Sequence, residues 1–316
     1  MKAFGLADEN ASPAVIEVPT PEAGPGEVRI RVHESSVNGY DAFVASGMAQ
    51  GMMEHRYPVV VGKDFAGVID SVGQGVTRFA VGDEVAGITP NEPYVSSGSY
   101  AEYVVVPAEG FIERKPEKLD FPQAASVGLA AVTALVAVDA VEASEGDLVL
   151  IVGATGGVGN YAVQLAARRG ASVVATGLPE DEGWISALGA SEMVDYSSDV
   201  AAAVREKHPE GVDALIVAVH LGEEFGPTAE LVKDGGKIAS TVGGAEAEEF
   251  ASRKVDAANV LGQADPGPYV EVLRMAAEGS LTVPITQTFP FEELPEALGL
   301  VGERRSRGKF AITISS

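Results

Sequence analysis

Cysteine is absent from the 316 residues of this chain. That absence excludes disulfides, thiol nucleophiles, iron–sulfur clusters and thiolate zinc sites. Histidine is scarce, since only four are present and no two are spaced as a metal-binding pair on a helix. Chemistry must therefore come from hydroxyl, amine, carboxyl and backbone groups, or from a bound cofactor.

Basic residues are also few, with 22 Lys and Arg against 46 Asp and Glu, for a formal net charge of −24. Such a charge repels nucleic-acid phosphates and anionic lipid surfaces, so we expect neither nucleic acid nor membrane as a partner. We see no apolar run approaching the roughly 20 residues that span a bilayer and no secretory pattern at the amino terminus. These features predict a cytoplasmic location.

The pattern of predicted secondary structure changes at about residue 120. Up to that point, short β-type segments are separated by glycine- and proline-containing turns, which predicts a small, mostly antiparallel β domain. From Asp147, strands and helices alternate strictly, which predicts a parallel sheet covered by helices on both faces. A further apolar segment near 255–261 could be a sixth strand.

The strongest local motif is the glycine-rich turn within Leu148–Gly170, "LVLIVGATGGVGNYAVQLAARRG", where a strand leads into an amphipathic helix. Gly156 and Gly159 match the second and third glycines of the G-x-G-x-x-G fingerprint, and Ala154 stands at the first. Backbone amides in such a turn approach a pyrophosphate at a helix N-terminus. The motif predicts dinucleotide binding by Ala154, Thr155, Gly156, Gly157, Val158 and Gly159.

The residues that would choose between NAD and NADP are ambiguous. The second strand ends at Thr176 and Gly177, and the acids Glu180 and Asp181 follow, where they could hold a ribose or begin a helix. Lys and Arg, which would bind a 2′-phosphate, are absent between Gly177 and Gly189.

Several ordered segments carry a resemblance that extends over essentially the whole chain: "SSVNGYD", "YPVVVGKDFAGVIDSVG", "SYAEYVVVP", "LVLIVGATGGVGNYAVQLAARRG" and the terminal "RGKFAITI". In their order and spacing the chain resembles the zinc-independent quinone oxidoreductase branch of the medium-chain dehydrogenase/reductase superfamily. The resemblance implies an α/β fold with two domains. A GroES-like β domain of residues 1–119 and 280–316 is interrupted by a Rossmann doubly wound parallel sheet over 120–279.

The resemblance also implies that no metal is bound. Zinc-using members have Gly-His-Glu where this chain has Gly62, Lys63 and Asp64, and a cysteine ligand near Asn38. An ammonium group donates hydrogen bonds and does not ligate. Lys63 could line the active-site cleft, although a simple Lys63–Asp64 salt bridge is the favoured interpretation.

The catalytic candidates implied by the resemblance are Tyr40, Asn38 and Lys63. Tyr40, within "SSVNGYD" beside Asp41, can donate a proton, and its alternative role is that of a half-buried packing residue. In addition to the glycine turn, the resemblance implies cofactor contacts from Asn38, Thr133, Thr176, Gly177, Val219, Ser240, Val242, Gly243 and Lys309. It implies NADPH as cofactor, with NADH not excluded, and a homodimer formed along the edge strand near 255–261.

These features together predict an NAD(P)H-dependent reductase that works without a metal. Lacking a Lewis acid, it needs an acceptor that delocalises negative charge, such as a quinone or an α,β-unsaturated carbonyl. One alternative is an enoyl reductase of a biosynthetic pathway. Another is a dinucleotide-binding protein without turnover.

Overall fold

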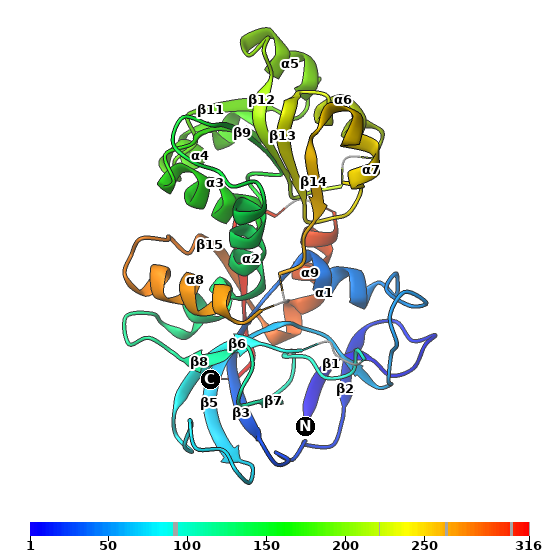
Figure 1. Cartoon of the computed structure of the whole chain (residues 1–316). Helices are drawn as coiled ribbons and strands as arrows, with labels where there is room; N and C mark the ends of the chain where they lie inside the picture. Colours follow the sequence, from blue (N-terminus) through cyan, green and yellow to red (C-terminus); the bar gives the residue numbers. More distant parts are fainter. Residues whose placement is uncertain (91–93, 221, 263–264, 304–305, 316) are drawn as a thin grey trace. The chain divides into compact units, whose positions relative to one another are not determined.

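The computed structural model describes residues 1–90, 94–220, 222–262, 265–303 and 306–315. They form two compact units, each described here by itself: a β-rich unit of Met1–Leu129 and Tyr269–Ser316, and a parallel-sheet unit of Ala130–Pro268 (Figure 1). The predicted fold class is confirmed. The unit boundaries differ from the predicted 119/120 and 279/280. The first boundary falls inside helix α2 (Phe121–Ala140), whose helical geometry is broken at Gly128 by φ −45° and ψ −118°.

The β-rich unit contains two sheets. The smaller has the order β2-β1-β4, and the larger has the order β15-β16-β3-β5-β6-β8 with β7 also paired to β3. Its strands are β1 (Lys2–Leu6), β2 (Ala14–Glu17), β3 (Glu27–Ser36), β4 (Val59–Val60), β5 (Asp64–Val72), β6 (Glu84–Ile88), β7 (Tyr103–Pro107), β8 (Ile112–Arg114), β15 (Ile285–Pro290) and β16 (Lys309–Thr313). Its other helices are α1 (Gly39–Ala45), α9 (Leu294–Gly302) and most of α8 (Gly267–Ala277).

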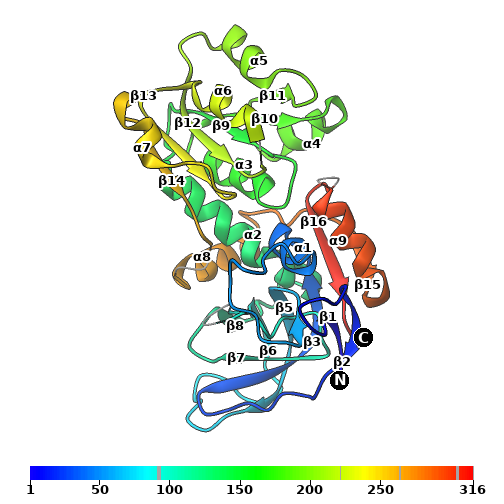
Figure 2. The same cartoon turned by 90° about the vertical axis from the view of Figure 1, so that its right-hand side faces the viewer.

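Strand β3 is the centre of this unit. Its alternate residues Val28, Ile30 and Val32 are fully buried, as expected for a strand with one face on the core. β3 pairs with β5, β7 and β16, so the carboxyl-terminal strand returns to the β-rich unit as the resemblance implies (Figure 2).

The parallel-sheet unit has six parallel strands in the order β11-β10-β9-β12-β13-β14. This is the strand order 3-2-1-4-5-6 of the Rossmann fold, whose ligands bind at the carboxyl ends of the strands where the order reverses. The strands are β9 (Leu148–Val152), β10 (Ser172–Gly177), β11 (Glu192–Asp195), β12 (Val212–Val217), β13 (Val232–Ser240) and β14 (Asp256–Asn259). The helices, besides the second part of α2, are α3 (Gly159–Arg168), α4 (Glu182–Ala187), α5 (Val200–Lys207), α6 (Phe225–Ala229) and α7 (Ala247–Phe250).

Helix α2 corrects the expectation that no apolar segment of this chain approaches the length that spans a bilayer. An 18-residue window of this 20-residue helix has a mean hydropathy of 1.7, and the helix is long and apolar enough to span a membrane by length and composition alone. Of that stretch, 72% is buried inside the protein, as in the core helix of a folded domain.

Strand β14 lies at one end of the six-stranded sheet, so one of its sides is not paired within the described residues of this chain. Just after it, Leu261 is 79% exposed. An open strand edge with an exposed apolar side chain is suited to closure by a second copy across a two-fold axis.

We therefore propose the homodimer expected along this edge. Leu261→Glu should shift the mass measured by light scattering at micromolar concentration from dimer to monomer, because the charge opposes apolar burial at the edge. Val15→Glu, at a 51% exposed position of β2, is the control and should leave the dimer intact. A monomer mass for the unmodified protein would contradict the proposal.

Candidate functional site

The glycine turn after β9 has the backbone geometry of a dinucleotide site. Gly153 adopts φ +82°, and a Cβ on Gly159 would lie 2.1 Å from the Gly153 carbonyl oxygen, so helix and turn approach too closely for any larger residue. Asn160 Nδ2 donates to the carbonyl oxygens of Gly156 and Gly157, which holds the turn against α3.

Helix α3 leaves its N-terminal end suited to an anion. Val158 at the N-cap offers no side-chain hydrogen bond, and no acidic residue lies in the first turn. Backbone amides and the helix dipole at such an end favour a phosphate group. The turn therefore fits the pyrophosphate of a dinucleotide.

The carboxyl end of β10 adjoins this turn. The Gly153 amide donates to Thr176 Oγ1 at 3.0 Å, and a Cβ on Gly177 would lie 3.3 Å from both Thr155 Cγ2 and Asp181 Cβ. Asp181 is only 7% exposed, and its Oδ2 accepts from the Leu178 amide at 3.0 Å. Asp181 is thus fixed at the strand end where a ribose is normally recognised.

Other predicted cofactor residues lie in the same unit. Val219, just beyond β12, would be 3.1 Å from a Cβ on Gly153. After β13, Ser240 Oγ donates to the Gly243 carbonyl oxygen at 2.7 Å and accepts from the Val242 amide at 3.3 Å. Since β9, β12 and β13 are parallel, these turns share one edge of the sheet with the glycine turn.

Thr133, on α2, packs against a glycine rather than against that edge. A Cβ on Gly262 would lie only 2.2 Å from Thr133 Oγ1. Its predicted contact with the cofactor stays a prediction.

A cluster of buried polar residues in the β-rich unit surrounds Asp64, whose side chain has no exposed surface. Asp64 Oδ2 accepts from Ser36 Oγ at 2.5 Å and from Asn38 Nδ2 at 2.8 Å, and it lies 3.7 Å from Lys309 Nζ. Asp64 Oδ1 accepts from the Leu129 amide at 2.7 Å. Both carboxylate oxygens are therefore engaged within the protein.

The Leu129 contact explains the break in α2. A Cβ on Gly128 would lie 2.2 Å from Asp64 Oδ1, so the carboxylate can approach only a glycine. Asp64 then accepts a hydrogen bond from an amide at the start of the second part of α2, as an N-cap residue does.

A second buried carboxylate, Asp41, belongs to the same cluster. Asp41 Oδ2 accepts from the Asn38 amide at 2.9 Å and from the Tyr100 hydroxyl at 3.0 Å. Asp41 Oδ1 is buried without a hydrogen-bond partner among the described residues. Burial, with the nearby Asp64 charge as the second cause, raises the pKa of Asp41 to about 7.

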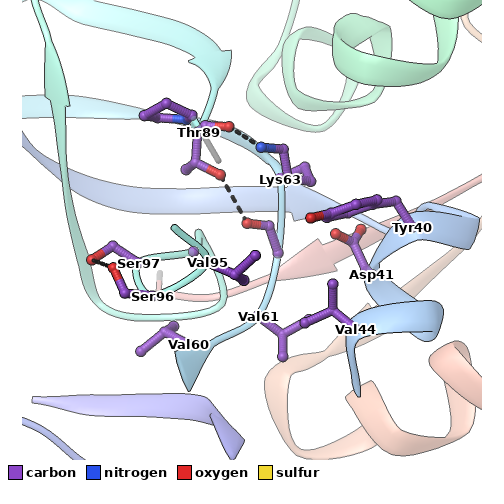
Figure 3. Close-up of a pocket in the computed structure, with 13 residues that line it drawn as sticks. Tyr40, Asp41, Val44, Val60, Val61, Lys63, Thr89, Val95, Ser96 and Ser97 are labelled. Carbon is purple, nitrogen blue, oxygen red and sulfur yellow. Dashed lines mark hydrogen bonds between the residues drawn. The ribbon is translucent and has the colours of Figure 1, made fainter. Parts of the chain in front are cut away.

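Asp41 also lines a pocket on the β-rich unit, together with Tyr40, Lys63 and Thr89. Figure 3 shows the Asp41 carboxyl group pointing toward Tyr40, and valines and the Ser96–Gly98 backbone complete the wall. The Tyr40 hydroxyl lies 3.5 Å from Met53 Sδ, a weak acceptor. The pocket thus combines a hydroxyl, an ammonium and a carboxyl group.

Lys63 reaches this pocket because of the glycine that precedes it. Gly62 adopts φ +105°, and a Cβ there would lie 2.6 Å from Ser99 Oγ. Lys63 is 3% exposed; its Nζ donates to the Thr89 carbonyl oxygen and lies 5.7 Å from the centre of the Tyr40 ring (Figure 3). Burial lowers the pKa of Lys63 to about 8, although Asp41 and Asp64 act in the opposite direction.

One interpretation made from the sequence, the Lys63–Asp64 salt bridge, needs correction here. The cation that pairs with Asp64 is Lys309 from β16, whereas Lys63 turns its Nζ to the Thr89 carbonyl oxygen. The Lys309 side chain is fully buried, and its Nζ donates to Asn38 Oδ1 at 2.8 Å and to the Val37 carbonyl oxygen at 3.0 Å. Both ends of the Asn38 amide are engaged inside the cluster. The predicted contacts of Lys309 and Asn38 with the cofactor stay predictions.

Zinc does not fit the donor set of this cluster. Asn38 and Asp64 already use their oxygens within the protein, and Lys63 has no lone pair to give while it is protonated. The described residues hold no group of three or more His, Asp or Glu side chains that could bind a metal ion.

Comparison with known families finds two family models that match parts of this chain. Residues 24–117 match the alcohol dehydrogenase GroES-like domain, and residues 188–312 match the zinc-binding dehydrogenase family. A solved NAD-dependent alcohol dehydrogenase is 31% identical with a TM-score of 0.86 over all of both chains. A quinone oxidoreductase from Coxiella burnetii is 29% identical with a TM-score of 0.88, over 100% of this chain and 99% of that one.

Curated relatives extend the comparison. A quinone oxidoreductase of Sus scrofa is 32% identical over 71% of this chain and 66% of its own length. A mycocerosic acid synthase-like polyketide synthase of Mycobacterium tuberculosis is 29% identical over 92% of this chain, which spans 14% of that protein.

The buried ammonium of Lys63 generates a prediction about stability. A fall in pKa from 10.5 to about 8 corresponds to about 3 kcal/mol of destabilisation while both folded and unfolded states carry the proton. Lys63→Met should therefore raise the thermal midpoint at pH 7, by somewhat less than this because the Thr89 carbonyl loses its donor.

The gain should disappear as the pH rises from 8 toward 10.5, because the folded state then releases its proton before the unfolded state does and the unmodified protein becomes more stable. Thermal melts at pH 7 and pH 10 measure both effects. Lys233→Met, which removes a partly exposed ion pair with Asp213, is the control and should give no gain. A lower midpoint for Lys63→Met at pH 7 would contradict the argument.

Proposed function

Because this chain belongs to the medium-chain dehydrogenase/reductase superfamily of oxidoreductases, we propose that it is a zinc-independent reductase that transfers hydride from a reduced nicotinamide dinucleotide to a quinone or an α,β-unsaturated carbonyl. The observation that carries the proposal is the pair of donors Tyr40 and Lys63 on one pocket, beside a cluster whose residues do not fit zinc. The quinone oxidoreductases among its relatives support the same acceptor class.

The two units have separate tasks in this proposal. The glycine turn and the end of β10 hold the dinucleotide, which when bound supplies the hydride. Tyr40 and Lys63 donate hydrogen bonds to the acceptor oxygen, where negative charge develops. Hydrogen bonds stabilise this charge less than a metal ion would, so good acceptors spread the charge over a conjugated system.

An enoyl compound of a biosynthetic pathway is a second candidate acceptor. It is favoured by the relatives within polyketide synthases, one of which aligns with 98% of this chain at 31% identity. Rates with simple enones, quinones and enoyl thioesters, compared in one assay, distinguish these substrate classes. A protein that binds the dinucleotide but reduces none of them would be a binding protein without turnover.

The charge at the end of β10 favours NADH over the NADPH that the resemblance implies. Burial raises the pKa of Tyr196, which follows β11, and the charges of Asp181, Glu180 and Asp195 raise it further. The sequence has no Lys or Arg between Arg169 and Arg205. A 2′-phosphate would meet repulsion there and no cationic partner. The NADPH-bound mycobacterial neighbour is only 23% identical, and that likeness extends to the fold alone.

We expect fluorescence titration to give a lower Kd for NADH than for NADPH. Asp181→Asn keeps an oxygen for the Leu178 amide and removes the charge, so it should reduce this preference at least about fivefold. Asp199→Asn, at the N-cap of α5, is the matched control and should leave the preference unchanged. Tighter binding of NADPH by the unmodified protein would refute the assignment.

Tyr40 provides the test of the acceptor site. Tyr40→Phe should lower kcat for an enone by about 10²-fold, since it removes a donor to the developing oxyanion. Quinones need less activation and should lose less, and the Kd for the dinucleotide should not change. Tyr103→Phe, on β7 beside Arg29, controls for the general effect of losing a tyrosine hydroxyl. Full kcat of Tyr40→Phe on every acceptor would mean that Tyr40 is only a packing residue.

A further inference from the structure

The pocket on the β-rich unit contains one carboxyl oxygen for which the protein provides no hydrogen bond. Among the described residues, Asp41 Oδ1 is buried without a partner, while Asp41 Oδ2 accepts from the Asn38 amide and the Tyr100 hydroxyl. Asp41 is 1% exposed and lines the pocket with Tyr40 and Lys63. A buried carboxylate oxygen without a donor is costly, and a proton on that oxygen removes the charge.

Asp64 provides the comparison within the same cluster. It is equally buried, but both of its oxygens accept hydrogen bonds and Lys309 neutralises its charge. Asp64 does not line the pocket. Of these two aspartates, Asp41 is thus the one that has an oxygen without a hydrogen-bond partner among the described residues and that lines the pocket.

We propose that Asp41 is the proton donor for the reduced acceptor in this pocket. The inference rests on the function proposed above, which leaves the source of the proton unassigned. Hydride addition converts the quinone or enone into an anion whose charge lies largely on oxygen, and that oxygen is held by Tyr40 and Lys63. The O–H bond of the Asp41 carboxyl breaks as the acceptor oxygen takes the proton.

Water replaces the proton that Asp41 gives to the acceptor. One hydride and one proton give the hydroquinone, or the enol that becomes the saturated ketone in water, and Asp41 is left as a carboxylate. It takes a new proton from water after the product leaves. Because the pKa of Asp41 is raised to about 7, both its acid and its base forms are populated near neutrality, which suits a general acid.

Several groups around Asp41 set the direction of its titration. Asp64 raises its pKa, whereas the hydrogen bonds from Asn38 and Tyr100 and the charge of Lys309 lower it. Lys63 interacts with the Asp41 charge, and Tyr40 is the other titratable group among the described residues that line the pocket. The acid form is present below about pH 7, so kcat should fall as the pH rises through this value.

The test is the pH profile of kcat for an enone with saturating NADH. Asp41→Asn keeps an oxygen for Asn38 and Tyr100 but cannot donate a carboxyl proton. It should lower kcat at pH 6 by about 10²-fold and abolish the fall near pH 7, leaving only the later fall caused by deprotonation of Lys63. The matched control is Asp70→Asn on β5, which removes a partly exposed ion pair with Arg29 and should keep the whole pH profile.

Tyr100→Phe provides a second test that does not depend on the Asp41 variant folding. It removes a donor that stabilises the Asp41 carboxylate, so the fall in kcat should move to higher pH; a merely structural role for Asp41 predicts no such shift. An Asp41→Asn enzyme that keeps both the rate and the fall near pH 7, or a Tyr100→Phe profile that does not move, would overturn the inference alone. An unmodified protein that reduces neither enones nor quinones would overturn the proposed function, and this inference with it.

Discussion

The structure of the candidate site depends on the buried carboxylate of Asp64. Its two oxygens connect β3 through Ser36, the turn before α1 through Asn38, β16 through Lys309, and α2 through the Leu129 amide. A buried charge is tolerated only when it is paired and fully hydrogen-bonded, and removing one partner from such a pair typically costs about 3–5 kcal/mol. The requirement to satisfy this one carboxylate thus brings together segments from both ends of the chain.

The hydrogen bonds to Asp64 also determine which side chains are engaged inside the cluster and which line the pocket. Asn38 and Lys309 hydrogen-bond to each other inside the cluster, and Asn38 also donates to Asp64. Lys63, Tyr40 and Asp41 line the pocket, and Asp41 Oδ1 has no hydrogen-bond partner among the described residues. The ion pair between Asp64 and Lys309 lies inside the cluster, and Tyr40 and Lys63 lie beside it on the pocket.

The parallel-sheet unit could be predicted from the sequence because its signals are local. Strand, turn and helix alternate within short stretches, and the glycine turn carries its own fingerprint, so a parallel sheet covered by helices and a dinucleotide-binding turn could both be predicted. The polar cluster could not be predicted in this way, since the Lys309–Asn38 hydrogen bond joins residues 271 positions apart. Nothing in the sequence alone shows that the Asn38 amide is engaged by a buried lysine. The isolated Lys63-Asp64 step was a real signal, but its two side chains have different partners.

The central claim is that donors on a pocket, and not a metal, activate a conjugated acceptor. The most direct measurement compares the reduction of an enone and of the matching saturated ketone by NADH, using protein treated with chelator and analysed for zinc. Our account predicts an unchanged rate with the enone, less than stoichiometric zinc, and a rate with the ketone lower by about 10²-fold or more. About one zinc per chain, activity lost on chelation and restored by zinc, and saturated ketones as the better substrates would contradict it.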